Sequence, residues 1–454
     1  MHHNFRQLMS GAHGGVNYSE SVLVFLFIVL IPFQDTLLQE SALGYFGASL
    51  SVIPLAGLII LHISKSIYQG VKPSRIFVGM LIYSILLSTL YLFILGFESH
   101  GTDLVFKAIK IGILGLFFIY PIFLLDYEKF NIAPAIYTAF LIAVLGVALN
   151  DYLTVGGLWP GGSFFHFYEN MNMRPRGFAL ESSTLSVQLL TLGLLTIHFI
   201  RSTFARLIIL IPLACLVLYA DSKGGSIAFL IAALGTVVIM RLPLATKVFA
   251  VLIIMLYASV ALSGMTTKLF GSATSATSAT SATKSLATRS TMAMTAVFIA
   301  IKNPLGVGFT GYLPAISEYG PKAAYIVDKY SGRKLNFSEV IPYFNGTSKF
   351  VSAKTFLFNY LIIFGWPFLI IFVLFFVELI RRIRNVSSLP LTAAVIFSVL
   401  AISTYSDGVG LYNLSLVFGV AYSEAFRKKQ FGNYHDQSNH IKHEGMAGLT
   451  DAGT

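Results

Sequence analysis

Basic residues at the edges of long apolar runs are the side chains of this sequence best placed for chemistry. Arg176 stands just before an apolar run that begins at 183, and Arg289 opens a segment that reads as a helix over 288–302. A guanidinium pairs with two phosphate oxygens at once, so arginines at the level of lipid headgroups suit a diphosphate. The alternative is that each is a solvated loop charge or a lipid headgroup contact. Further diphosphate contacts are predicted at Lys223, Lys354 and Arg174.

Apolar runs make up most of the remaining chain. Of its 454 residues, 56% are hydrophobic and 11% are charged, whereas a soluble domain is about a quarter charged. This composition predicts an all-α polytopic membrane protein with about 12 transmembrane helices, because each run is near the roughly 17–25 residues that cross a bilayer. The predicted spans are 19–34, 44–64, 76–97, 104–125, 131–150, 183–200, 205–220, 225–240, 246–265, 353–379, 388–405 and 410–426.

Lysine and arginine alternate between the two sides of the predicted membrane. The short connections on one side carry only Lys223. The other side is therefore cytoplasmic by the positive-inside rule, and both termini lie there, as an even number of spans requires. The basic connections hold Arg6; Lys65, Lys72 and Arg75; Lys129; Arg201 and Arg206; Arg241 and Lys247; Arg381, Arg382 and Arg384; and Arg427, Lys428 and Lys429.

Two long loops interrupt a single transmembrane domain over 1–454 and are predicted to be external. They cover 151–182 and 265–352, and the second is expected to contain short helices. Within it, a repeat of Ser-Ala-Thr triplets (272–283) is taken as having no apolar content and is predicted to be a mobile linker. The polar segment 431–454 is predicted to be a disordered cytoplasmic tail.

Several function classes are excluded by missing motifs. The sequence has no P-loop, no His-Glu-x-x-His, no Cys-x-x-Cys and no Asp-x-Asp. We therefore expect no metal and no cofactor. The net charge is +11, but most Lys and Arg residues stand in short connections between apolar runs, so we expect no nucleic acid partner. The single cysteine, Cys215, cannot form a disulfide within one chain.

Four short stretches carry a family resemblance. They are Arg176–Ser182, the Asp221–Gly225 hairpin, Asn303–Phe309 downstream of Arg289, and Lys354–Trp366. In this order and at these topological positions they resemble the O-antigen polymerase (Wzy-type) and O-antigen ligase superfamily. The hydropathy layout is similar over nearly the whole chain.

The resemblance implies a C-type glycosyltransferase membrane fold and a metal-independent, inverting transfer from undecaprenyl-diphosphate-linked glycans. It also implies the outer face of the bacterial inner membrane as the location. Two departures favour a polymerase over a ligase: Lys354 stands where ligases place a histidine, and Ser222-Lys223-Gly224 replaces the usual Ser-Arg-Gly. An O-antigen ligase or a capsule polymerase remains an alternative within the superfamily. A lipid-linked oligosaccharide flippase is the alternative from another class.

The implied chemistry assigns roles to particular side chains. Arg176 and Arg289 are expected to stabilise the negative charge of undecaprenyl diphosphate as it leaves, and a base takes the proton of the attacking hydroxyl. Glu181 is the leading candidate base, although it is equally suited to holding Arg176; His166 and Glu169 are rivals, and Lys354 takes the position of the ligase histidine. The expected partners are undecaprenyl-diphosphate-linked oligosaccharides, membrane lipids and a chain-length regulator protein.

Two lysines inside a predicted span admit two interpretations. Lys107 and Lys110 lie near the external end of the run 104–125. Their long side chains can reach outward to the membrane surface, because lysine places its ammonium in water while its stem stays in lipid. The other interpretation is a role near the site, since charged residues within a span are often functional.

Overall fold

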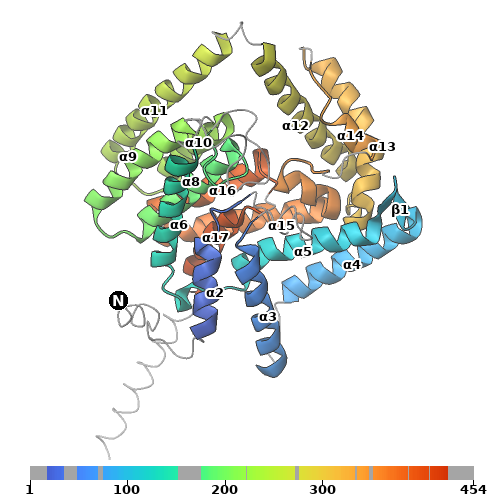
Figure 1. Ribbon diagram of the computed structural model, residues 1–454, viewed down its shortest axis with the longest axis horizontal. Helices are drawn as coiled ribbons and strands as arrows, with labels where there is room; N and C mark the ends of the chain where they lie inside the picture. The colour runs from blue at the N-terminus through green and yellow to red at the C-terminus, as the bar shows by residue number, and fades with distance from the viewer. Residues whose placement is uncertain are drawn as a thin grey trace, which may run out of the picture.

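The fold is built almost entirely from α-helices (Figure 1). The computed structural model describes residues 18–34, 49–69, 75–151, 175–220, 222–270, 276–332, 335–346, 351–386, 388–407 and 410–427. One short antiparallel hairpin, β1 (Glu98–Ser99) with β2 (Thr102–Asp103), joins two of the helices. The mostly helical architecture predicted from composition is confirmed for these ranges. The tail 431–454 and most of the first long loop lie outside them.

Each of the twelve apolar runs overlaps a described helix. Two of these helices end in a π-helical turn, at Val147–Asp151 and Ser423–Arg427. The helices are α2 (Tyr18–Val29), α3 (Val52–Gln69), α4 (Arg75–Leu95), α5 (Leu104–Phe123), α6 (Ala133–Gly146), α8 (Ser182–Phe199), α9 (Thr203–Tyr219), α10 (Lys223–Ile239), α11 (Leu244–Phe270), α15 (Phe356–Val386), α16 (Leu389–Thr404) and α17 (Tyr412–Tyr422).

Length and apolar exposure identify a membrane protein. Three described helices, α5, α8 and α15, are long and apolar enough to cross a bilayer, and eight shorter apolar helices accompany them. Large apolar side chains also face outward on α4, α9 and α11, as Phe93, Ile211 and Leu256 do. A soluble protein rarely exposes apolar surface of this extent. The count of twelve spans stays a prediction.

Helix α8 forms the centre of the bundle. Nearly all of its side chains from Ser182 to Ile197 are buried, and it packs against α6, α9, α16 and α17. Its polar side chains are used for contacts between helices: Thr191 accepts a hydrogen bond from Asn413 Nδ2 at 2.8 Å, and Gln188 donates to the Pro32 carbonyl at 3.3 Å. Buried polar groups with partners fix the neighbours of a helix more specifically than apolar packing alone.

A sharp kink divides α15 into a short first part and a long second part. Gly365 has φ +64 and ψ −153, a conformation that favours glycine, and Pro367 follows it. The kink leaves backbone groups without helical partners, and a turn from elsewhere in the chain supplies them. Trp366 N donates to the Pro304 carbonyl at 2.9 Å, and Val307 N donates to the Ile362 carbonyl at 3.0 Å.

That turn is the tip of a helical hairpin formed by α12 (Ala276–Lys302) and α13 (Gly308–Tyr330), which lie side by side (Figure 1). Gly306 and Gly365 face each other so closely that a Cβ on either would overlap the other backbone. The Tyr83 hydroxyl of α4 donates to the Leu305 carbonyl. Because Tyr83 lies twelve residues before the end of α4, or roughly 18 Å along a helix, the tip reaches the middle of α4.

The hairpin changes two expectations for the second long loop. Its main helices are 27 and 23 residues long, not short, and among the described residues of this loop only α14 (Ile341–Phe344) is brief. The linker prediction for the Ser-Ala-Thr repeat is wrong from Ala276 onward, where the chain is already helical. Every third residue of the repeat is alanine, the strongest helix former, which offsets the weaker serine and threonine. The expected helix over 288–302 is confirmed and ends at Lys302, just before Asn303-Pro304.

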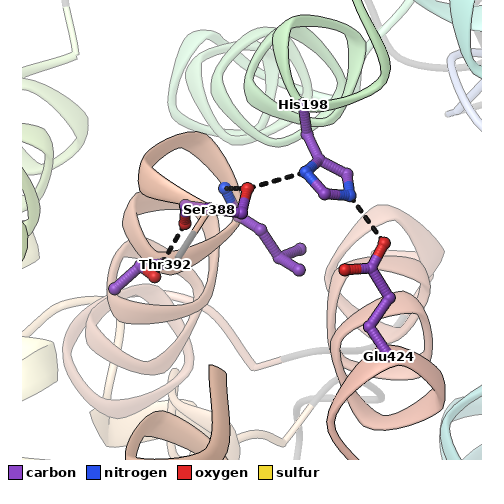
Figure 2. A network of polar contacts seen from close by, with 5 residues as sticks. His198, Ser388, Thr392 and Glu424 are labelled. Carbon is purple, nitrogen blue, oxygen red and sulfur yellow. Dashed lines mark hydrogen bonds and ion pairs between the residues drawn. The ribbon is translucent and has the colours of Figure 1, made fainter. Parts of the chain in front are cut away.

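The helix ends gather into two groups. The end that carries the starts of α8, α10, α15 and α17 is called the outer end, after its charge-based prediction. There Gln34, beyond α2, donates from Nε2 to the Gly410 carbonyl at 3.1 Å. The opposite, inner end holds the contacts of His198 drawn in Figure 2: Nε2 donates to the Glu424 carboxylate and Nδ1 bonds to the Ser388 hydroxyl, each at 2.7 Å. Helix α16 therefore begins at the end of the bundle where α8 and α17 finish, so it runs opposite to both.

Candidate functional site

Arg176 is buried in the turn that leads into α8. Its side chain is 4% exposed, and its carbonyl accepts from Ala179 N at 2.9 Å. Gly177 has φ +54, and a Cβ there would stand 3.2 Å from the Val147 nitrogen at the end of α6. Phe178 stacks on Phe33 with ring centroids 5.0 Å apart. The segment Arg176–Phe178 is thus fixed between the ends of α2 and α6, at the outer end.

Glu181 lies at the N-terminus of α8 in extended backbone, with φ −152 and ψ 168. Its side chain is exposed and accepts a hydrogen bond from the Ser183 hydroxyl. A carboxylate at a helix N-terminus interacts favourably with the helix dipole. Glu181 therefore has a structural reason to stand at this position, and its role as a base stays a prediction.

Lys223 opens α10 in a hairpin that touches α8. Ser222 caps the helix by accepting from Gly225 N at 3.1 Å. A Cβ on Gly225 would stand 2.8 Å from Ser186 Cβ, so glycine is what lets α10 approach α8 at this point. On the other side of the hairpin, a Cβ on Gly224 would stand 3.6 Å from the ring of Tyr405. The hairpin is thereby held between α8 and the segment that follows α16.

Arg289 joins the same group through Tyr405. The positive charge of Arg289 acts electrostatically on the Tyr405 phenol. Arg289 is half-buried on α12, and no carboxylate among the described residues pairs with it or with Lys223. Arg289 and the hairpin that begins α10 with Lys223 are thus both linked to one tyrosine.

Lys354 lies at the same end but already has a carboxylate partner. Its ammonium is 2.9 Å from Glu339 Oε1 and 5.7 Å from the centre of the Tyr343 ring. Burial lowers the pKa of Lys354, but Tyr343 and Glu339 outweigh it and leave the pKa above its ordinary value. Lys354 also has φ +63, which is uncommon for a residue with a side chain. It is therefore a fixed cation, neutralised in part by Glu339.

A hydrogen-bonded network beside Lys354 was missed by sequence reasoning. Asn359 Oδ1 accepts from the Tyr312 hydroxyl at 2.6 Å, and Asn359 Nδ2 donates to Ser352 Oγ at 3.3 Å. The Ser352 hydroxyl donates to Asp407 Oδ2 at 3.4 Å. One signal could have identified Asp407: it is the only acidic residue of the sequence between Glu378 and Glu424, and it falls in a connection predicted to be external.

The segment 405–407 connects these parts. Tyr405 lies beside the Lys223 hairpin and interacts electrostatically with Arg289. The Ser406 carbonyl accepts from Phe356 N at 2.7 Å, and Asp407 Oδ2 accepts from Ser352 Oγ at 3.4 Å. The structure thus brings Lys223, Arg289 and Lys354 around one segment. Arg176 lies on the same end, at the start of the helix that carries Ser186. These residues and the segment 405–407 are called the outer-end cluster.

The remaining predicted residues are not all placed. His166, Glu169 and Arg174 lie outside the described residues. Lys107 and Lys110 stand in the first two turns of α5, partly buried, so both interpretations of them stay open. In the described part of the chain, no three His, Cys, Asp or Glu side chains gather closely enough to hold a metal ion, and metal independence stays a prediction.

Comparison with known proteins found a protein whose sequence is similar to that of this chain. No family model matches the sequence. The chain is similar to an uncharacterised 49.5 kDa protein in the cps (capsule) region of Klebsiella pneumoniae, with 29% identity over 367 residues. The alignment covers 79% of this chain and 81% of that protein. The similarity therefore extends over most of both chains.

Proposed function

We propose that this protein is a polysaccharide polymerase of the O-antigen polymerase and ligase superfamily. It transfers a lipid-diphosphate-linked glycan onto a second lipid-linked repeat unit at the outer face of the inner membrane. The observation that carries the proposal is the outer-end cluster. Separate stretches of the chain, chosen from sequence for their cations, meet there around Tyr405, with Arg289 and Lys223 lacking a carboxylate among the described residues.

The proposed mechanism needs fixed positive charge more than it needs a metal. A hydroxyl on the acceptor sugar attacks the anomeric carbon of the donor, the bond to phosphate breaks, and undecaprenyl diphosphate leaves with the electron pair. Negative charge grows on the leaving group, so cations already held in place stabilise the transition state more than the ground state. Arg176 and Arg289 take this role, with Lys223 and Lys354 as weaker contacts, because Glu339 already compensates Lys354.

The product class has two candidates. An O-antigen follows from the family resemblance. A capsular polysaccharide is the second candidate, because the similar protein from Klebsiella pneumoniae lies in a cps (capsule) region. A ligase of the same superfamily would require a core acceptor without a diphosphate-linked lipid. A flippase would need no catalytic base and would make no new glycosidic bond.

Purified protein in lipid vesicles tests the proposal directly. Supplied only with undecaprenyl-diphosphate-linked repeat units and a chelator, it should build a ladder of longer glycans that mild acid releases. Mild acid cleaves the anomeric phosphate bond and leaves ordinary glycosidic bonds intact. A ladder that requires added core acceptor would identify a ligase. The absence of any glycosidic product, with transport of the lipid-linked glycan between leaflets, would favour a flippase.

The proposed orientation has both termini in the cytoplasm and the outer-end cluster in the periplasm. It is tested by labelling single cysteines with an impermeant thiol reagent in spheroplasts. Because Cys215 is exposed on α9, it is first replaced by serine. A cysteine at Lys322 of α13 should label in intact cells, and one at Arg384 of α15 only after permeabilisation. The reverse pattern would contradict both the topology and the mechanism.

A further inference from the structure

Tyr405 carries a buried hydroxyl group in the middle of the outer-end cluster. The residue directly follows Thr404, the last residue of α16. Its hydroxyl oxygen is buried, and no described residue forms a hydrogen bond with it. An unpaired buried donor is costly, so the large majority of such groups in folded proteins have a partner. The fold itself gives no reason for a hydroxyl at this position.

Other tyrosines of the bundle use their hydroxyls to join elements of the fold. Tyr312 of α13 donates to Asn359 Oδ1 of α15 at 2.6 Å, and Tyr91 of α4 donates to Asn303 Oδ1 at the hairpin tip at 2.9 Å. The hydroxyl of Tyr405 makes no such link within the described chain. Only the ring of Tyr405 contributes to packing, beside the start of α10. Phenylalanine would supply the same ring without an unpaired oxygen.

The surroundings of Tyr405 favour a negatively charged partner for this hydroxyl. The positive charge of Arg289 acts on the phenol, but the guanidinium does not hydrogen-bond to it. A Cβ on Gly224 would stand 3.6 Å from the ring, in the first turn of α10, where the helix dipole favours an anion. The carboxylate of Asp407, two residues further on, acts electrostatically on Tyr360 of α15. Arg289 and the hydroxyl are thus suited to bind the same anionic group.

We propose that the Tyr405 hydroxyl donates a hydrogen bond to the substrate diphosphate beside Arg289, and is therefore a further catalytic residue. This inference rests on the proposed function, which supplies the diphosphate. A phenol has one hydrogen to donate, and a charged acceptor makes such a bond stronger. When the bond between the anomeric carbon and the phosphate oxygen breaks, its electron pair stays on that oxygen. The hydrogen bond then strengthens as the reaction proceeds. Tyr405 keeps its proton throughout, which separates this role from that of the base.

Binding of the leaving group tests the contact without turnover. Purified protein in detergent is titrated with undecaprenyl diphosphate, and the rise in unfolding temperature gives the Kd. Tyr405→Phe should weaken binding about 10- to 100-fold, because a hydrogen bond to a charged group is lost. Tyr257→Phe on α11 is the matched control. Its hydroxyl is also buried, but Ser226 interacts with it and no described cation does. The control should bind undecaprenyl diphosphate as tightly as wild type.

Stability without the lipid separates a substrate contact from a structural role. Tyr405→Phe removes only an unpaired oxygen, so its unfolding temperature in the absence of lipid should equal or exceed that of wild type. A lower temperature would show that the hydroxyl holds the fold together and would overturn the inference. Wild-type affinity in Tyr405→Phe would overturn it as well, because water would then be the partner of the hydroxyl.

The ladder assay distinguishes this inference from the proposed function. Tyr405→Phe should lower the initial rate of ladder formation about 10- to 100-fold, because the lost hydrogen bond is strongest on the leaving group. A wild-type rate for this variant would contradict a catalytic role. A wild-type protein that binds undecaprenyl diphosphate through Tyr405 but builds no ladder would overturn the proposed function and leave the diphosphate contact standing.

Discussion

The two ends of this bundle use charged side chains in different ways. At the inner end, described carboxylates are paired locally: Glu20 with Lys65, Glu378 with Arg381 and Arg382, and Glu424 with His198. At the outer end, Lys354 has Glu339, but Arg289 and Lys223 have no such partner among the described residues. Ion pairs of this kind join helices but contribute little net free energy to stability. Positive charge that no described carboxylate pairs with is suited to an anionic ligand, so we propose that the outer end binds the ligand and that the inner end is structural.

The largest expected effect comes from removing an outer-end arginine. Arg289→Ala should lower the rate of ladder formation about 100- to 1000-fold, or about 3–4 kcal/mol, because one charge-assisted contact to the leaving group is lost. Arg289→Lys keeps the charge without the guanidinium fork and should recover part of the rate. The measurement is polymer length and initial rate at equal amounts of folded protein.

The matched change at the inner end is Arg382→Ala. Arg382 pairs with Glu378 and lies 4.2 Å from the centre of the Phe426 ring. Its loss should leave the rate within a few-fold of wild type, since no transition-state charge develops there. Equal losses for Arg289→Ala and Arg382→Ala would mean that general electrostatics, and not a site, explain the activity.

A second contrast lies beside the outer-end cluster, between the neighbouring glycines Gly224 and Gly225 of α10. Gly225→Ala should lower the free energy of unfolding by about 1–3 kcal/mol, the usual cost of overpacking, because its Cβ would stand 2.8 Å from Ser186 Cβ. Gly224→Ala, at 3.6 Å from Tyr405, should be tolerated. Thermal unfolding in detergent measures both. Similar behaviour of the two variants would show that the close approach of α8 and α10 is not needed.

The inner end should respond through stability alone. His198→Gln keeps polar atoms but loses the geometry that joins α8 to Ser388 and Glu424 (Figure 2). We expect a loss of about 0.5–1.5 kcal/mol, the net worth of one hydrogen bond. The rate per folded molecule should not change. A fall in rate at unchanged unfolding temperature would place His198 in the catalytic machinery and contradict the division between the two ends.

Much of the architecture followed from periodicity and charge, because span-length apolar runs and alternating basic connections are local signals. The same local signals indicated the cations Arg176, Arg289 and Lys223 as candidate site residues. The contacts that join them were not predictable, since the fit of Gly306 against Gly365 and of Gly225 against Ser186 depends on helices distant in sequence. The linker prediction for the Ser-Ala-Thr repeat was wrong for a physical reason. The polarity of the repeat indicated a linker, whereas alanine at every third position favours the helix that begins at Ala276.

The smallest expected effect concerns the ion pair between Lys354 and Glu339, which lies at the outer end but resembles the ion pairs of the inner end. Glu339→Gln removes the partner of Lys354, and a half-exposed pair of this kind contributes about 0.2–1 kcal/mol. Because the pKa of Lys354 is raised above its ordinary 10.5, the contribution is fully present below that pH and is lost only as pH rises through the higher folded-state value. The effect of Glu339→Gln on stability should therefore be constant between pH 6 and pH 9. If Lys354 also contacts the diphosphate, freeing its charge should lower the KM for the donor, whereas Lys354→Met should raise it. An unchanged KM in both variants would limit Lys354 to a structural role and leave Arg176 and Arg289 as the diphosphate contacts.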